Sequence, residues 1–161
     1  MIVAGGCRGR TLAKALIEEG HAVRITTRSE AGRGAIEATG AECWVGTPDR
    51  LLTLRGALDG VTILCWLLGS CIGTDAELLE LHSARLQFFL TQTIDTTVRG
   101  FMYEARGTTT PTHVLAEGER VARELVARNS IPARFLSADP HQPDAWLDGA
   151  RAAIGELLGG G

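Results

Sequence analysis

The feature that most constrains the fold of this chain is a regular alternation of short apolar runs with amphipathic stretches. The apolar runs have the length of strands, and in the segments between them the apolar residues recur at the spacing of a helix. Strands that alternate with helices in this way predict a parallel sheet with right-handed crossovers and helices on both faces. We therefore expect an α/β chain with a three-layer, doubly wound Rossmann fold and a six-stranded parallel sheet in the order 3-2-1-4-5-6.

The expected strands and helices cover most of the chain. Strands are expected at 2–4, 22–26, 42–45, 61–67, 98–103 and 133–136. Helices are expected at about 9–19, 29–39, 49–58 and 74–90, then from about 111 past 126, and at 144–158. No internal repeat or linker interrupts the pattern, so residues 1–161 are expected to form one Rossmann-type domain without a separate substrate domain.

Composition narrows the classes of function. The net charge of −3 implies no general attraction to nucleic acid or to an anionic membrane. The longest apolar run, 61–72, is too short to span a bilayer. No basic segment followed by an apolar one opens the chain, so we expect no leader and a cytoplasmic protein. The cysteines, at 7, 43, 65 and 71, lack the spacing of a zinc site, so no metal is expected.

The strongest local signal is the loop 5–10, which lies between the first expected strand and helix. It reads Gly5, Gly6, Cys7, Arg8, Gly9 and Arg10. Gly6 and Gly9 match the last two glycines of G-x-G-x-x-G, where the first lets the backbone approach a pyrophosphate and the second lets the helix pack on the strand. Ala4 stands at the position of the missing first glycine, and Gly5 is expected to supply the freedom of the turn. The alternative is an ordinary strand-to-helix turn that uses glycine for packing alone.

The end of the second strand indicates which dinucleotide is bound. NAD sites usually carry an acid there, about twenty residues beyond the glycine loop, to bind the ribose 2′-hydroxyl. This chain has Thr27 and Arg28 instead. Arg28 could pair with a 2′-phosphate, and Arg8 and Arg10 could close on the same phosphate. NADP is therefore the expected cofactor and NAD the less favoured one; the alternative is that the three arginines are solvated.

Two other segments are expected to border the ligand crevice. The fourth strand should end over it and place Leu68 and Gly69 beside the ribose and nicotinamide, unless they form a core strand and a turn. In the loop 105–112, a threonine hydroxyl or the following His113 could meet a substrate, but helix capping by Thr110 or Thr112 explains the same residues. Cys7, at a helix N-terminus beside Arg8, is a candidate redox-sensitive thiol or a small loop residue.

Five stretches carry a resemblance to a known family: Gly-Cys-Arg-Gly-Arg at 6–10, Gly-His-Ala-Val-Arg at 20–24, Thr-Thr-Arg at 26–28, Trp-Leu-Leu-Gly at 66–69 and Val-Arg-Gly-Phe-Met-Tyr-Glu at 98–104. They resemble the NAD(P)-binding Rossmann superfamily, in particular extended or atypical short-chain dehydrogenases and NmrA-like proteins. The chain is also similar to a small group of actinobacterial Rossmann proteins. The resemblance implies nucleotide binding and an oxidoreductase, or an epimerase/dehydratase-like relative.

The chain departs from the dehydrogenase pattern at the residues that catalyse the reaction, while the glycine loop expected to bind the dinucleotide is present. The family uses a Tyr-x-x-x-Lys pair, whereas the single tyrosine here, Tyr103, is followed four residues later by Gly107. The single lysine, Lys14, lies in the first helix. No catalytic residue is therefore assigned. Three hypotheses stand: an NADP(H)-binding oxidoreductase or its descendant, which also binds an unknown small molecule; a non-catalytic dinucleotide sensor or scaffold; and a vestigial fold whose site binds nothing. A homodimer through the helices after strands four and five is a further expectation.

Overall fold

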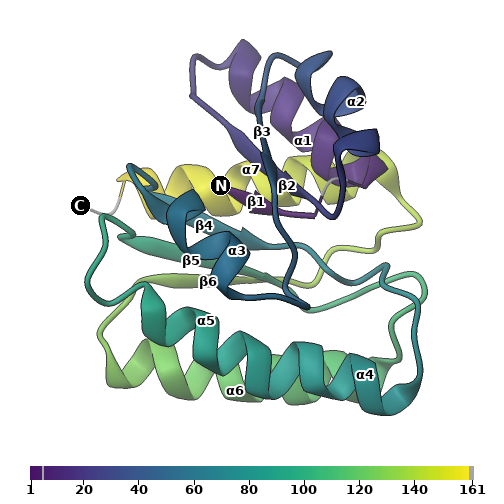
Figure 1. Cartoon of the computed structure of the whole chain (residues 1–161), viewed down its shortest axis with the longest axis vertical. Helices are drawn as coiled ribbons and strands as arrows, with labels where there is room; N and C mark the ends of the chain where they lie inside the picture. The colour runs from purple at the N-terminus through teal and green to yellow at the C-terminus, as the bar shows by residue number, and fades with distance from the viewer. Residues whose placement is uncertain (5, 160–161) are drawn as a thin grey trace.

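The computed structural model describes residues 1–4 and 6–159 and contains a six-stranded parallel sheet (Figure 1). The strand order is β3-β2-β1-β4-β5-β6, so the expected fold class and order are confirmed. The strands are β1 (Ile2–Val3), β2 (Arg24–Thr27), β3 (Glu42–Val45), β4 (Ile63–Trp66), β5 (Gly100–Glu104) and β6 (Ala133–Leu136).

The short strand β1 lies at the centre of the sheet. Ile2 pairs with Ile25 of β2 on one side, and Val3 pairs with Trp66 of β4 on the other. The chain leaves β1 for β2 in one direction and reaches β4 in the other, so the strand order reverses between β1 and β4. In open α/β sheets ligands bind at such a reversal, beyond the carboxyl ends of the strands.

Helices cover both faces of the sheet (Figure 1). One face packs against α1 (Cys7–Glu18), α2 (Arg33–Glu37) and α7 (Pro143–Gly159). The other packs against α3 (Leu52–Arg55), α4 (Asp75–Glu80), α5 (Leu86–Gln92) and α6 (Thr112–Arg128). The apolar core is accordingly divided by the sheet into two clusters, one under each helical layer.

Strand β4 shows why the sheet is held from both sides. All four of its residues are buried, as its uninterrupted apolar run predicts for a central parallel strand. Leu64 and Trp66 belong to the core under α5 and α6, whereas Ile63 and Cys65 belong to the core under α1 and α7. The alternation follows from the pleat, which sends successive side chains to opposite faces.

Three expected helices differ from those observed. The helix expected at 29–39 is a 3₁₀ turn, η1 (Glu30–Gly32), followed by the short α2; Gly32 and Gly34 weaken its helical propensity. The helix expected at 49–58 is α3 followed by the 3₁₀ turn η2 (Gly56–Leu58). The long helix opens with a capping box at Thr74 and Glu77, but a π-helical segment, η3 (Leu81–Arg85), separates α4 from α5.

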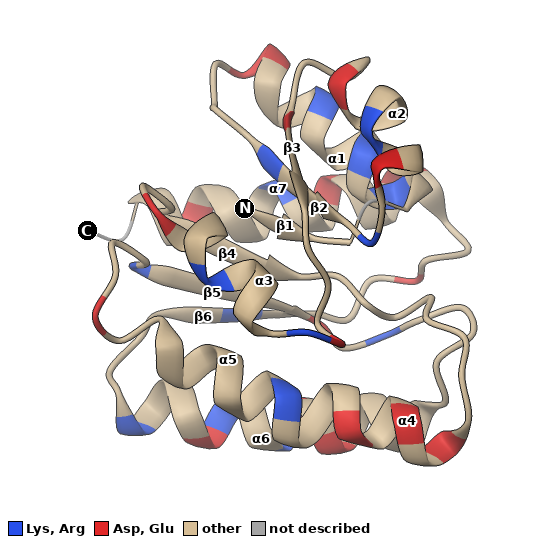
Figure 2. Cartoon of the chain, in the orientation of Figure 1, with Lys and Arg blue, Asp and Glu red and all other residues tan. Residues whose placement is uncertain are grey.

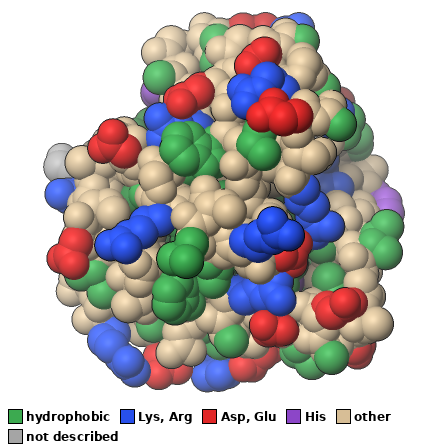
Figure 3. Space-filling view, viewed as in Figure 1, with side chains coloured by type: hydrophobic (Ala, Val, Ile, Leu, Met, Phe, Trp, Pro, Cys, Tyr) green, Lys and Arg blue, Asp and Glu red, His purple; other side chains and the backbone are tan. Residues whose placement is uncertain are grey.

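The surface carries charges of both signs. Basic and acidic residues are interspersed along α2 and α6 in Figure 2 and over the face seen in Figure 3. In α6 they form ion pairs one turn apart, such as Arg123 with Glu119 at 2.6 Å. Among residues 1–4 and 6–159, no helix combines the length and the apolar character needed to cross a membrane, and no group of side chains could hold a metal ion.

Candidate functional site

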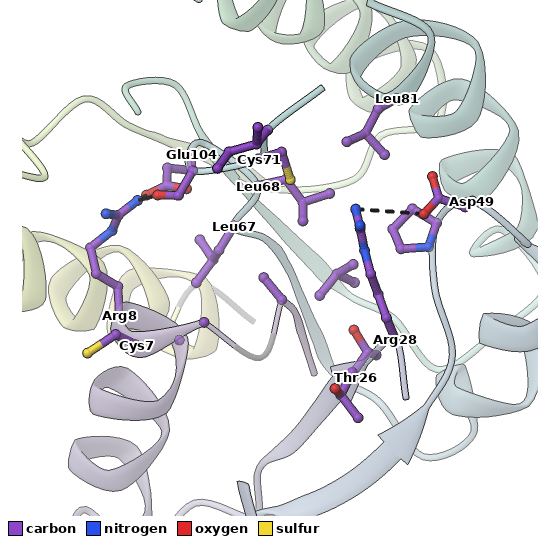
Figure 4. A pocket seen from close by; sticks show the side chains of 18 of the residues that line it. Cys7, Arg8, Thr26, Arg28, Asp49, Leu67, Leu68, Cys71, Leu81 and Glu104 are labelled. Carbon is purple, nitrogen blue, oxygen red and sulfur yellow. Dashed lines mark hydrogen bonds and ion pairs between the residues drawn. The ribbon is translucent and has the colours of Figure 1, made fainter. Parts of the chain in front are cut away.

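A cavity of about 560 Å³ opens at the carboxyl ends of β1, β2 and β4, where the strand order reverses (Figure 4). Its walls combine the loop before α1, the end of β2, the segments that follow β3 and β4, and single residues from η3, β5 and α7. The lining residues are Val3, Ala4, Gly6, Cys7, Arg8, Gly9, Thr26, Thr27, Arg28, Gly46, Pro48, Asp49, Leu67, Leu68, Ser70, Cys71, Ile72, Leu81, Glu104 and Trp146.

The glycine loop forms one wall, and its two described glycines differ in what they contact. Helix α1 begins at Cys7, with Gly6 as its N-cap, so the helix starts two residues earlier than expected. A Cβ on Gly9 would collide with the carbonyl oxygen of Ala4, which confirms that Gly9 lets the helix pack on the strand. A Cβ on Gly6 would meet nothing within 4 Å, so the backbone of Gly6 faces open space. Gly5 lies outside the described residues.

Ala4 has a backbone conformation that glycine favours. Its φ is 147°, and it occupies the position of the missing first glycine of the motif. A side chain at such a φ is strained, because only glycine adopts this region readily. The loop thus keeps the backbone shape of the motif at this position with alanine in place of glycine.

Arg28 stands at the outer end of the cavity (Figure 4). It follows Thr26 and Thr27, which also line the cavity, and its side chain is 67% exposed. A carboxylate that sequence reasoning did not anticipate lies beside it: Asp49, in the segment between β3 and α3, approaches Arg28 to 3.7 Å. No acid lies at the end of β2 itself, but the fold brings one there from the next strand.

Arg8 points to the opposite end of the cavity from Arg28 (Figure 4). Its Nη2 donates to Glu104 at 3.0 Å and to Ser70 at 2.5 Å, and its guanidinium lies over the ring of Trp146. The structure therefore does not bring Arg8 and Arg28 together around one phosphate. Arg10 lies in the first turn of α1 and is not among the described residues that line the cavity.

Glu104 is the site residue that sequence reasoning missed most clearly. Its side chain is fully buried at the end of β5. It accepts hydrogen bonds from Arg8, from the backbone N–H of Gly69 at 2.7 Å and from the indole N–H of Trp146 at 3.1 Å. One carboxylate thus ties the glycine loop to β4, β5 and α7. An acid that ends a buried apolar run at the carboxyl edge of a parallel sheet was the available signal.

The segment after β4 meets the loop 105–112 at close range. Leu68 lines the cavity as expected, whereas Gly69 is not among its described lining residues. A Cβ on Gly69 would lie 2.8 Å from both Glu104 Oε2 and Gly107 Cα, so this glycine permits close packing. Thr110 does not cap α6, whose N-cap is Pro111; its hydroxyl donates to the carbonyl of Leu68 at 3.0 Å and fixes the two loops together.

Tyr103 and His82 form a buried pair under the sheet, away from the cavity lining. The Tyr103 hydroxyl lies 2.7 Å from His82 Nδ1 and donates to the carbonyl of Leu115 at 3.2 Å. Burial raises the pKa of Tyr103 far above its usual value. Gly118 of α6 leaves room for the hydroxyl. The position of Tyr103 is that of a packing residue.

The two cysteines at the cavity differ in environment. Cys7 is exposed at the start of α1, and Cys71 is half-buried in the segment after β4. Burial raises the pKa of the Cys71 thiol. Figure 4 shows the two side chains pointing from different walls. A redox role for Cys7 stays a prediction.

The cavity as a whole suits an elongated ligand with anionic groups. Amides at a helix N-terminus have no acceptors within the helix and carry a positive partial charge, so they attract anions. One arginine stands at each end of the cavity, and between them the walls are apolar at Val3, Leu67 and Leu68.

Comparison with known proteins supports the fold. No family model matches the chain, and no curated protein matches it. Three similar solved structures come from different proteins. The triphenylmethane reductase of Citrobacter sp., complexed with NADP(H), has a TM-score of 0.62 at 19% identity over 84% of this chain and 48% of that one. A short-chain dehydrogenase/reductase superfamily protein from Agrobacterium tumefaciens with bound NAD has a TM-score of 0.67 at 17% identity over 83% and 47%.

The third is UDP-glucose 4-epimerase from Thermotoga maritima, with a TM-score of 0.68 at 11% identity over 83% of this chain and 53% of that one. The chain therefore spans about half the length of these solved structures. At such low identity the likeness establishes the shared architecture. The chain has the same Rossmann-type fold as these three solved structures.

Proposed function

We propose that the cavity binds NADP(H), with NAD(H) as the weaker ligand. The observation that carries the proposal is the open space above Gly6 at the N-terminus of α1, with Arg28 on the adjoining wall. Gly6 and the first amides of α1 would receive the pyrophosphate. Arg28 would pair with the 2′-phosphate through its planar donors.

The fold rule sets the direction of the ligand. In a Rossmann sheet the adenosine half lies over the β1–β3 side and the second nucleotide over the β4–β6 side. This direction would place the adenosine near Thr27 and Arg28, and the nicotinamide near Leu67 and Leu68. Arg8, held by Glu104, would then close the nicotinamide end.

The other residues predicted to bind the dinucleotide would contribute according to their positions. Cys7 and Gly9 would contribute backbone at the pyrophosphate. Gly69 would act indirectly, because its amide is engaged by Glu104. Arg10, in the first turn of α1, would add positive charge near the phosphates.

The proposal is tested by filling the open space above Gly6. Gly6→Leu would place a side chain where the pyrophosphate is expected, and the φ of −67° at Gly6 accepts any residue. Gly34→Leu is the matched control, because a Cβ on Gly34 of α2 would also meet nothing within 4 Å and Gly34 lies outside the cavity lining. Calorimetry should show NADPH binding by wild type and Gly34→Leu and its loss in Gly6→Leu. Equal binding by all three proteins would refute the site.

A second candidate function is a non-catalytic dinucleotide sensor. The burial of Tyr103 against His82 favours it, because a tyrosine in that position cannot meet a ligand in the cavity. The alternative is an NADP(H)-dependent oxidoreductase or an epimerase/dehydratase-like protein that works without a Tyr-x-x-x-Lys pair. Absorbance at 340 nm during incubation of NADPH with a panel of carbonyl compounds separates the two. Steady oxidation of NADPH that requires the protein would exclude the pure sensor.

A further inference from the structure

A carboxylate stands between two guanidinium groups at the outer end of the cavity. Asp49 Oδ1 lies 2.5 Å from Arg85 Nη1, and Asp49 Oδ2 lies 3.7 Å from Arg28 Nη2. Thr47 donates its hydroxyl to Oδ2 at 3.0 Å. Arg28 follows β2, Asp49 follows β3 and Arg85 ends η3, so three separate parts of the chain meet at this point. Figure 4 shows Asp49 and Arg28 facing each other across the cavity mouth.

In this arrangement the guanidinium groups of Arg28 and Arg85 both face the carboxylate of Asp49. Arg85 is held firmly, since its side chain is only 23% exposed and its Nε donates to Glu80 at 3.2 Å. Asp49 is half-exposed, and Arg28 is more exposed still. The ion pair between Asp49 and Arg28 is exposed and exposed pairs are weak, so a ligand anion can displace the Asp49 carboxylate from Arg28.

Of the carboxylates near Arg28 and Arg85, Asp49 is the one that a ligand anion would have to displace. Asp49 and Glu104 are the carboxylates among the described lining residues, and Glu104 lies at the other end. Glu80 contacts Arg85 from the outer side, and Glu77 is engaged in the capping box of α4. Asp49 alone therefore stands between the two arginines.

We propose that Arg85 is a second ligand of the adenosine 2′-phosphate and that the Asp49 carboxylate lies where this phosphate binds. This inference rests on the proposed function and adds to it the residues that set the preference for a 2′-phosphate. On binding, the phosphate takes the place of the Asp49 carboxylate between Arg28 and Arg85. Asp49 then opposes the 2′-phosphate by charge repulsion and by competing for both arginines.

Two small nucleotides isolate the 2′-phosphate. Adenosine 2′,5′-bisphosphate and 5′-AMP differ by that group alone, and calorimetry gives a Kd for each. Arg85→Gln should weaken binding of the bisphosphate roughly tenfold, the size of one charge-assisted contact, and leave 5′-AMP unchanged. Asp49→Asn should tighten the bisphosphate several-fold, on the order of one exposed charge interaction, with 5′-AMP again unchanged.

Arg50→Gln is the matched control, because Arg50 is exposed and adjoins Asp49 in sequence but, among the described residues, forms no ion pair with Asp49, whereas Arg85 does. It should leave both constants as in wild type. If Arg50→Gln and Arg85→Gln weaken the bisphosphate alike, or if Asp49→Asn weakens either nucleotide, the inference is wrong while the proposed function stands. If neither nucleotide nor NADPH binds wild-type protein, both are wrong.

Discussion

Glu104 fixes several segments of the chain at the end of the cavity opposite Arg28. Its carboxylate accepts from Arg8, Gly69 and Trp146 while fully buried. A buried charge is stable only when it is paired and hydrogen-bonded, and all three donors serve that purpose here. The end of an apolar run marks the position of Glu104, but its partners could not be identified from the sequence, because they come from segments up to 96 residues away.

Replacement of Glu104 should be costly. Glu104→Gln removes the charge that Arg8 requires and turns an amide N–H₂ toward one of the donors. We expect the free energy of unfolding to fall by about 2–4 kcal/mol, the range for breaking a buried ion pair. Glu42→Gln is the control, since Glu42 pairs with Arg24 at 2.8 Å but is 55% exposed, and its loss should cost about 1 kcal/mol or less. Urea denaturation measures both; equal costs would contradict the assigned role of Glu104.

A substitution at Ala4 should increase the free energy of unfolding, in contrast to the replacement of Glu104. Its φ of 147° suits glycine, so Ala4→Gly should relieve strain and raise the free energy of unfolding by about 1 kcal/mol. The same change at Ala116, an exposed residue inside α6, should lower it by about 0.5–1 kcal/mol, because glycine disfavours a helix interior. Urea denaturation of the two variants gives the comparison. A loss of stability in both would show that Ala4 is not strained.

Among the elements, the long helix formed by α4, η3 and α5 departs from its sequence pattern at the π-helical segment η3. The periodicity of Leu78, Leu81, Leu86 and Phe89 predicts its buried face correctly. It does not predict the π-helical segment, whose extra residue per turn rotates the residues within it. His82 lies four residues after Leu78 and four before Leu86, on the same buried face, and contacts Tyr103, although a polar residue in a helix is ordinarily expected at the surface.

Burial of His82 gives a pH dependence. Burial lowers the pKa of His82 to about 4, whereas the unfolded chain protonates a histidine near 6.5. Between these values the unfolded state binds a proton that the folded state does not, so the free energy of unfolding decreases as the pH falls from 6.5 to 4. The histidine accounts for about 3 kcal/mol of this loss at most.

The variant His82→Gln should flatten the curve of unfolding free energy against pH in that window, since glutamine does not titrate. His141→Gln, at an exposed site, should reproduce the wild-type slope. Urea denaturation at intervals between pH 7 and pH 4 provides the measurement. A wild-type slope in His82→Gln would mean that other groups cause the acid sensitivity.

At the scale of the whole molecule, the sequence pattern was sufficient for the layers and the strand order. Apolar runs locate strands, glycines mark turns, and right-handed crossovers leave few topologies. The site was only partly predictable. Gly6, Gly9 and Arg28 follow from local motif and position, whereas Asp49 and Glu104 reach the cavity through contacts between distant segments. Arg8 shows the same limit: its place in the loop was clear, but its direction depends on Glu104.

The central claim is that one cavity holds a dinucleotide between the glycine loop and Arg28. A crystal structure of the protein with millimolar NADPH tests it most directly. We predict electron density for the pyrophosphate at the amides that follow Gly6, for the 2′-phosphate beside Arg28, and for the nicotinamide along Leu67 and Leu68. An ordered dinucleotide at another site, or a cavity without density at saturating NADPH, would contradict the claim.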